Sequence, residues 1–344
     1  MSRHTTFIFS ATVILLSACS KEPTIEQVQG YAQGTDYTIS WWSENDTDTK
    51  AIKQEFSETL EQVDKEISTY RPDSYISGFN NNPSIDWQPA SKDFIELLEI
   101  AQTVNADSLG CYDPTIGPLF DLWGFQSDKF KVPSPQDIAD VQAEVGLDKI
   151  EIDLKGLKIR KILPQLALNF SSMGEGYTIY KLSHVLEKQG ITNYLISFGG
   201  DMKIRGHKPA DKQWRIAIQN PKTEQPTVYK IITINDQQSE GVTLDTSGTY
   251  RHYFDENGQR YSHILDARTG APVTHNLISA SVFGNDPRVS DAWATAMLCL
   301  GEREGSSIAE QQGLSAFFIQ DKESELIDSK SSLLTSNPKL VFNN

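Results

Sequence analysis

Residues 249–265, TYRHYFDENGQRYSHIL, carry the clearest fold signal in the chain, because two strand-like segments flank a turn. The turn, Asp255-Glu256-Asn257-Gly258, is typical of a hairpin between antiparallel strands. Short apolar or alternating segments recur on both sides of it. We expect strands at Tyr37–Trp42, Tyr194–Phe198, Trp214–Ile218, Val228–Ile234, Gly241–Asp245, Thr249–Phe254, Gln259–Leu265, Leu277–Phe283 and Leu314–Gln320.

Helical signals lie mainly in the first half of the chain. One amphipathic stripe has apolar side chains at spacings of three and four, and it comprises Ile52, Phe56, Leu60, Val63 and Ile67. We also expect helices at Asp93–Val104, from Ser134 to Gly146, from Gly174 to Gln189, at Pro287–Leu300 and at Glu302–Gln312. Because helices cluster early and hairpins late, we predict an α+β fold of mostly antiparallel sheets flanked by helices. It would form a single large domain, which could comprise two α/β lobes.

The first residues resemble an export signal. A basic start with Arg3 precedes the apolar stretch Phe7–Leu16, which is too short to cross a bilayer. Leu16-Ser17-Ala18-Cys19 resembles a bacterial lipobox, which predicts removal of residues 1–18 and a lipid on Cys19. The alternative is ordinary cleavage that leaves Cys19 unmodified. We therefore expect a signal peptide at 1–18, a lipidated tether at 19–30 and the functional domain at 31–344.

Composition excludes several classes of protein. The 344 residues are 38% hydrophobic, which argues against disorder, collagen or a coiled coil for the whole chain. The net charge is −15, and it becomes −16 once Arg3 is removed with the signal. Such a field repels phosphate backbones, so we expect no nucleic-acid partner. Of the cysteines left after lipidation, we expect Cys111 and Cys299 to be unpaired buried thiols, with a single disulfide as the alternative.

Familiar catalytic motifs are absent from the sequence, including Walker A, His-Glu-x-x-His, CxxC and Gly-x-Ser-x-Gly. Other segments are instead dense in residues that ordinary strands and helices rarely contain. They are Ser68–Ser74, Gly110–Phe125, Asn169–Tyr177 and a group formed by Thr246–Gly248, Tyr261–Gly270 and Asp291–Ala296.

Two of these segments contain candidate chemistry. Asp291 and Thr295 are four residues apart near a helix start, so both oxygens can face one point, as a Mg²⁺ site requires. The structural alternative is a helix-start acid and a core threonine. His263, in an alternating segment with Asp266 three residues later, could accept a proton from a hydroxyl nucleophile. A sheet-face histidine held by a carboxylate is the alternative there.

Together these segments resemble the FAD:protein FMN transferase family, the ApbE-type flavin transferase lipoproteins. The resemblance covers roughly residues 34–301. It rests on Gly34-Thr35-Asp36-Tyr37, Ser68–Asn80, Gly110–Phe125, Gly174-Glu175-Gly176-Tyr177, Ser197–Asp201 and His263–Gly270. It implies an enzyme that moves FMN from FAD onto a threonine hydroxyl of an acceptor flavoprotein and releases AMP.

The resemblance also implies roles for individual residues. FAD, as substrate, would contact Gln33, Tyr70, Cys111, Tyr112, Asp113, Asn169, Glu175 and Ile264. Mg²⁺ would be held by Asp291, Thr295 and the backbone carbonyl of Ser172, and His263 would be the catalytic base. Asn169 departs from the family, which usually has aspartate there.

The expected location is the bacterial cell envelope, with the lipid on Cys19 anchoring the chain to a membrane and the domain facing the periplasm. Two other functions remain open at this point. The same site could hydrolyse FAD to FMN and AMP with water as acceptor, or the chain could be a non-catalytic FAD-binding lipoprotein.

Overall fold

The computed structural model describes residues 23–127, 129–223, 225, 227–235, 240–250, 252–323 and 325–343. The expected signal peptide and Cys19 lie outside these residues. Strand β1 begins at Glu26 and pairs with β2 in the main sheet. The prediction of a tether is therefore wrong for residues 26–30.

The helices agree closely with the sequence prediction where the sequence has an amphipathic stripe or a capping signal. Those of the described residues are α1 Thr49–Ile67, α2 Tyr75–Asn81, α3 Lys92–Asp107, α4 Gly117–Trp123, α5 Pro135–Gln142, the 3₁₀ turn Leu147–Lys149, α6 Gly174–Lys188, α7 Pro287–Gln312 and α8 Ser332–Thr335. Ser134 caps α5 in a capping box with Asp137, as its sequence pattern indicates.

The main sheet has eight strands in the order β1-β2-β6-β7-β10-β15-β16-β17, and every neighbouring pair is antiparallel. Its strands are β1 Glu26–Ala32, β2 Thr35–Trp42, β6 Asn193–Phe198, β7 Asp201–Arg205, β10 Val242–Gly248, β15 Leu277–Gly284, β16 Ser315–Lys322 and β17 Glu325–Lys330. The predicted α+β class with mostly antiparallel sheets is therefore confirmed.

Smaller sheets surround this one. They are formed by β8 Trp214–Gln219, β9 Val228–Ile234 and β18 Leu340–Asn343; by β3 Gln88–Pro89, β5 Lys158–Lys161 and β4 Ile150–Asp153; by β11 Tyr253–Glu256 and β12 Gln259–Ser262; and by β13 Leu265–Asp266 and β14 Ala271–Pro272. In the predicted hairpin, Asn257 and Gly258 both have positive φ, 52° and 79°, as a two-residue turn between twisted strands requires.

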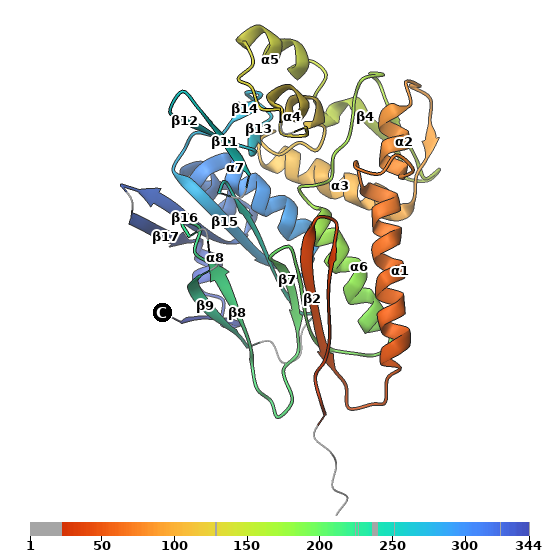
Figure 1. Cartoon of the computed structure of the whole chain (residues 1–344), viewed down its shortest axis with the longest axis vertical. Coiled ribbons are helices and arrows are strands. Elements are labelled where there is room, and N and C mark those ends of the chain that lie inside the picture. Colours follow the sequence, from red (N-terminus) through yellow and green to blue (C-terminus); the bar gives the residue numbers. More distant parts are fainter. Residues whose placement is uncertain are drawn as a thin grey trace, which may run out of the picture.

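The main sheet is covered on both faces. Helices α1 and α6 bury the apolar face of β2 and β6, and α7 lies against β10 and β15 (Figure 1). On the opposite face, β8, β9 and β18 form a separate core with side chains such as Leu244 and Phe317. The helical layer is the one that carries the site described below.

Helix α7 changes direction at Gly301, whose φ of 76° and ψ of 170° are not helical. The two consecutive helices expected on either side of Gly301 are thus present, joined by this break. The first of them begins at Pro287 and carries Asp291 and Thr295, two of the predicted site residues.

Cys111 and Cys299 form a disulfide, with their Cα atoms 6.0 Å apart, so the expectation of two free thiols is wrong. Cys111 follows α3, and Cys299 lies on α7. Because α3 packs against α7, two residues separated by 188 positions become neighbours. The apolar sequence around Cys299 correctly indicates burial but contains no information about this tertiary contact.

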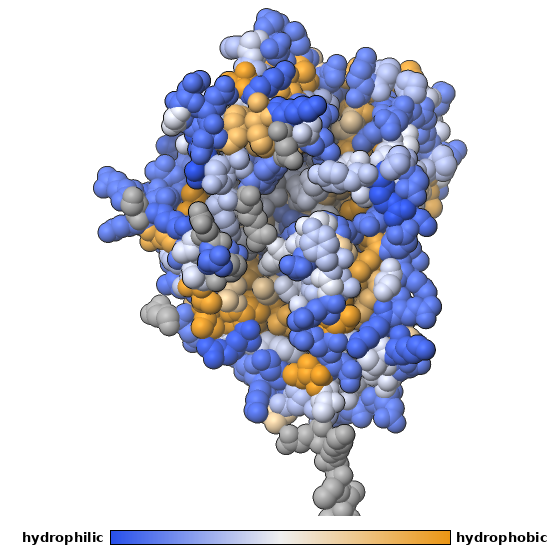
Figure 2. Space-filling view, viewed as in Figure 1, coloured by the Kyte–Doolittle hydropathy of each residue, from blue (hydrophilic) through white to orange (hydrophobic). Residues whose placement is uncertain are grey.

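The visible face of the molecule is mostly hydrophilic, with apolar side chains in small scattered groups (Figure 2). Within the described part of the chain, no helix combines the length and the apolar character needed to cross a membrane.

Candidate active site

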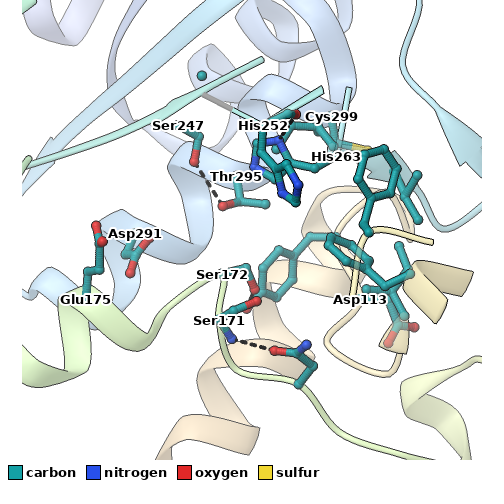
Figure 3. Close-up of a pocket in the computed structure, with 18 of the residues that line it drawn as sticks. Asp113, Ser171, Ser172, Glu175, Ser247, His252, His263, Asp291, Thr295 and Cys299 are labelled. Atoms are coloured by element: carbon teal, nitrogen blue, oxygen red, sulfur yellow. Dashed lines mark hydrogen bonds between the residues drawn. The ribbon is translucent and has the colours of Figure 1, made fainter. Parts of the chain in front are cut away.

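A cavity of about 320 Å³ lies where several segments that are distant in the sequence converge (Figure 3). Its wall includes residues of the loop after α3, the loop before α6, the end of β10, the β12–β13 connection and the first turns of α7. These are the segments that the sequence singled out for unusual composition.

Nearly all of the predicted site residues line this cavity. They are Tyr70, Cys111, Tyr112, Asp113, Asn169, Ser172, Glu175, His263, Ile264, Asp291 and Thr295. Gln33 is the exception, because its amide oxygen accepts a hydrogen bond from Thr178 of α6 at 2.8 Å and it is not part of the cavity wall. Tyr70, which is 78% exposed, lies where the cavity opens to solvent.

Asp291 lies at the junction of α6 and α7. Its Oδ2 accepts a hydrogen bond from the backbone N–H of Gly176 at 2.9 Å, in the first turn of α6. A helix N-terminus favours such an anion. One turn further along α7, the hydroxyl of Thr295 lies 3.0 Å from the Ser247 hydroxyl of β10. In Figure 3, Asp291 faces Glu175, and Thr295 faces Ser247.

Two further buried acids lie beside this pair, and neither was predicted from the sequence to be a site residue. They are Asp201 at the start of β7 and Asp245 in β10, both buried. Burial and the neighbouring Asp291 carboxylate raise the pKa of each well above its ordinary value. Burial and Glu175 likewise raise the pKa of Asp291. Asp245 lies in a strand that also contains Thr243, Thr246 and Ser247, so its sequence surroundings carry no distinct signal for it.

The donor set fits a hard divalent cation. Carboxylate, hydroxyl and carbonyl oxygens are the ligands that Mg²⁺ prefers. Among the described residues, no Lys or Arg forms an ion pair with Asp201, Asp245 or Asp291. Buried carboxylates without a counter-charge are costly, and a bound cation would supply that charge.

His263 is hydrogen-bonded to the protein backbone. Its Nδ1 is 2.8 Å from the carbonyl oxygen of His252, and a carbonyl only accepts hydrogen bonds, so the proton lies on Nδ1. The lone pair is then on Nε2, the nitrogen that can accept a proton from a hydroxyl. Asp266, the sequence neighbour considered as a partner, instead binds the guanidinium of Arg268 at 2.8 Å.

Asp113 lies in the cavity wall, where its hydrogen bonds hold the surrounding loop. Its carboxylate accepts hydrogen bonds from both the N–H and the hydroxyl of Thr115 and from the N–H of Leu147. Nearby, the Ser172 hydroxyl donates to the Tyr112 hydroxyl at 3.2 Å, and the Asn169 side chain accepts from Ser171 N–H at 2.8 Å. These bonds order the two loops that face each other across the cavity.

The close approach of α6 to α7 leads to a prediction for Gly176→Ala. The new methyl group would overlap the carbonyl of Pro287 and lie 2.8 Å from Cβ of Asp291. We expect the free energy of unfolding to fall by about 1–3 kcal/mol, because the two helices must separate. Chemical denaturation measures this change.

Gly174→Ala, two residues away in the same helix, is the matched control. Its methyl group would contact only Cδ1 of Ile67, at an ordinary 3.6 Å. We expect unchanged or slightly higher stability. Equal losses in the two variants would contradict the helix-contact explanation.

Comparison with known proteins identifies the family of this chain. The model of the ApbE family matches residues 33–318. Proteins named FAD:protein FMN transferase are similar to this chain. The one from Klebsiella pneumoniae is 33% identical over 317 residues, covering 89% of both chains. The one from Haemophilus influenzae is 32% identical and covers 94% of both chains.

Solved structures show the same fold. The flavin transferase ApbE from Vibrio cholerae superimposes with a TM-score of 0.82 at 29% identity, over 91% of this chain and 99% of the other. The apo flavinyl transferase ApbE from Pseudomonas stutzeri has a TM-score of 0.82 at 32% identity, over 92% and 97%. The fold and the site thus define an enzyme of the flavin transferase class. The chain belongs to the ApbE family.

Proposed function

We propose that this enzyme transfers FMN from FAD onto a threonine hydroxyl of an acceptor flavoprotein, depends on Mg²⁺ and releases AMP. The relatives' name, FAD:protein FMN transferase, supports the flavin donor and the protein acceptor. The observation that carries the proposal is the convergence of Asp291, Thr295 and His263 on one cavity.

The cavity residues would have separate roles in ring binding and proton transfer. Tyr70, Tyr112 and Ile264 supply aromatic and apolar surface for a flavin or adenine ring, and Asn169 supplies polar groups nearby. His263, with its proton fixed on Nδ1, would accept the proton of the threonine hydroxyl at Nε2. The hydroxyl oxygen then attacks the phosphorus of the FMN half, and AMP leaves.

Asp291, Thr295 and the carbonyl of Ser172 would hold Mg²⁺. When bound, the cation neutralises charge on the diphosphate, which phosphoryl transfer requires. Asp291 is pre-oriented for this task by the N–H of Gly176. Glu175, beside Asp291, would add negative charge that favours a cation at this site.

We further propose that the mature chain is a lipoprotein of the bacterial cell envelope, anchored through Cys19 and facing the periplasm. The lipobox-like Leu16-Ser17-Ala18-Cys19 supports this location. Mass spectrometry of the mature N-terminus tests it. A diacylated Cys19 is expected, and an unmodified Cys19 or a retained signal would contradict the anchor.

The test of the activity combines the enzyme, FAD, MgCl₂ and a candidate acceptor domain. We expect the acceptor to gain one FMN on a threonine. An acceptor in which that threonine is replaced by valine should gain none. One AMP should appear per FMN attached, and EDTA should stop both. Bound FAD without any Mg²⁺-dependent turnover would contradict the proposal and favour an FAD-binding protein.

A further inference from the structure

Asp245 lies directly across from the helical turn that carries Asp291. Along β10, residues alternate between the two faces of the sheet. Thr243 Oγ1 is 2.7 Å from Ser290 Oγ of α7, and Ser247 Oγ is 3.0 Å from Thr295 Oγ1. Asp245, between these two contacts, therefore faces α7, while Leu244 belongs to the core on the other face.

The Asp245 carboxylate is fully buried and unsatisfied. Its side chain is 0% exposed, and neither of its oxygens has a hydrogen-bond partner among the described residues. Asp201, on the adjacent strand β7, is also buried, and its Oδ1 accepts a hydrogen bond from Thr246 N–H at 2.7 Å. Charged groups are rarely left buried without a partner, so an unpartnered carboxylate points to a missing positive charge.

The basic side chains on the surrounding elements are engaged elsewhere. Lys203 of β7 is directed to Ser183 and Glu187, and Arg205 also pairs with Glu187. Arg288, in the first turn of α7, binds Asp286 and Glu96. Within the described chain, the negative charge of Asp245 is thus opposed by no nearby cation of the protein.

We propose that Asp245 is a positioning residue that strengthens cation binding at Asp291, by adding its negative charge to the acidic surroundings of that site without touching the substrate. This inference rests on the proposed Mg²⁺ site. A divalent cation held by Asp291 would be attracted to Asp245 through a low-dielectric interior, where such attraction is strong. In the cation-free protein, burial and the carboxylates of Asp291 and Glu175 disfavour the ionised form of Asp245, and the Thr243 hydroxyl offsets only part of this cost.

Two opposite effects of Asp245→Asn follow. Without a cation, the neutral amide removes repulsion, so the variant should unfold at a temperature equal to or higher than that of the wild type. With Mg²⁺, the variant lacks the attraction between the Asp245 carboxylate and the cation. It should therefore bind Mg²⁺ about tenfold more weakly than the wild type, or weaker still. A merely structural role for Asp245 would lower the unfolding temperature and leave the cation affinity unchanged.

The experiment follows thermal unfolding of the full chain during a MgCl₂ titration, after removal of metal with EDTA and without FAD or acceptor. The variants are Asp245→Asn, Asp291→Asn and Glu58→Gln. Glu58 is an exposed acid of α1 and changes net charge equally, so its variant should bind Mg²⁺ like the wild type. Asp245→Ser serves as a second neutral variant if the asparagine protein does not fold.

The outcomes separate the two proposals. A Mg²⁺ shift that Asp291→Asn abolishes and Asp245→Asn leaves unchanged would overturn only the role of Asp245. Lower stability of Asp245→Asn without metal, together with wild-type affinity, would do the same. A wild-type protein with no Mg²⁺-dependent shift would overturn the proposed metal site and this inference together.

Discussion

Asp291→Ala is expected to reduce FMN transfer by about a thousandfold or more. Its carboxylate is buried, oriented by the N–H of Gly176 and placed next to Thr295 in the cavity wall. Without this carboxylate the site would hold the cation poorly, and losing a positive charge that stabilises the transition state of phosphoryl transfer typically costs about 10³-fold or more. The rate of covalent flavin incorporation into an acceptor measures the effect, and circular dichroism should show an intact fold.

A conservative pair at Thr295 provides the control for this prediction. Thr295→Ser keeps the hydroxyl that faces Ser247, so it should retain most of the activity. Thr295→Val keeps the shape but removes the oxygen, so it should lose activity and need more Mg²⁺. Equal activity of the serine and valine variants would show that the Thr295 hydroxyl does not hold the cation, and an active Asp291→Ala enzyme would refute the site itself.

Removing the Cys111–Cys299 disulfide is expected to have the largest effect on stability. The bond joins residues 188 positions apart, so it restricts the unfolded chain strongly. Loss of a native disulfide that closes such a long loop typically lowers the free energy of unfolding by about 2–5 kcal/mol. Denaturation of Cys111→Ala/Cys299→Ala and of the wild type, with and without a dithiol reductant, measures this effect.

The double variant is also the control for the reductant. It should unfold at the same denaturant concentration in both conditions, whereas the wild type should unfold earlier when reduced. If the reductant left the unfolding of the wild type unchanged, the disulfide would not stabilise this protein.

Local sequence signals account for the elements that were predicted correctly. The apolar stripe of α1, the capping box of α5 and the Asn257-Gly258 turn are each determined by residues close together in the chain. Strand β1 was missed because it is an edge strand that pairs with β2, and its sequence, EQVQGYA, has little apolar alternation. Short elements such as α4 depend on tertiary packing, here around Trp123, and their sequences carry weak signals.

The candidate site follows the same division. Asp291 and Thr295 are one helical turn apart, a spacing that allowed either a shared metal site or a helix-start acid and a core threonine, and the family resemblance favoured the metal site. Asp245 and the disulfide depend on contacts between β10 and α7 and between α3 and α7, which the sequence does not encode locally. Gln33 was expected from the family resemblance to contact FAD. In the structure its side chain accepts a hydrogen bond from Thr178 and does not line the cavity.

The release of AMP with and without an acceptor protein distinguishes an FMN transferase from an FAD hydrolase. The enzyme would be incubated with FAD and Mg²⁺, and AMP would be quantified over time. A transferase predicts AMP release that depends on the acceptor and equals the FMN attached to its threonine. Release of AMP and free FMN at the same rate without acceptor would contradict the account and identify the enzyme as an FAD hydrolase.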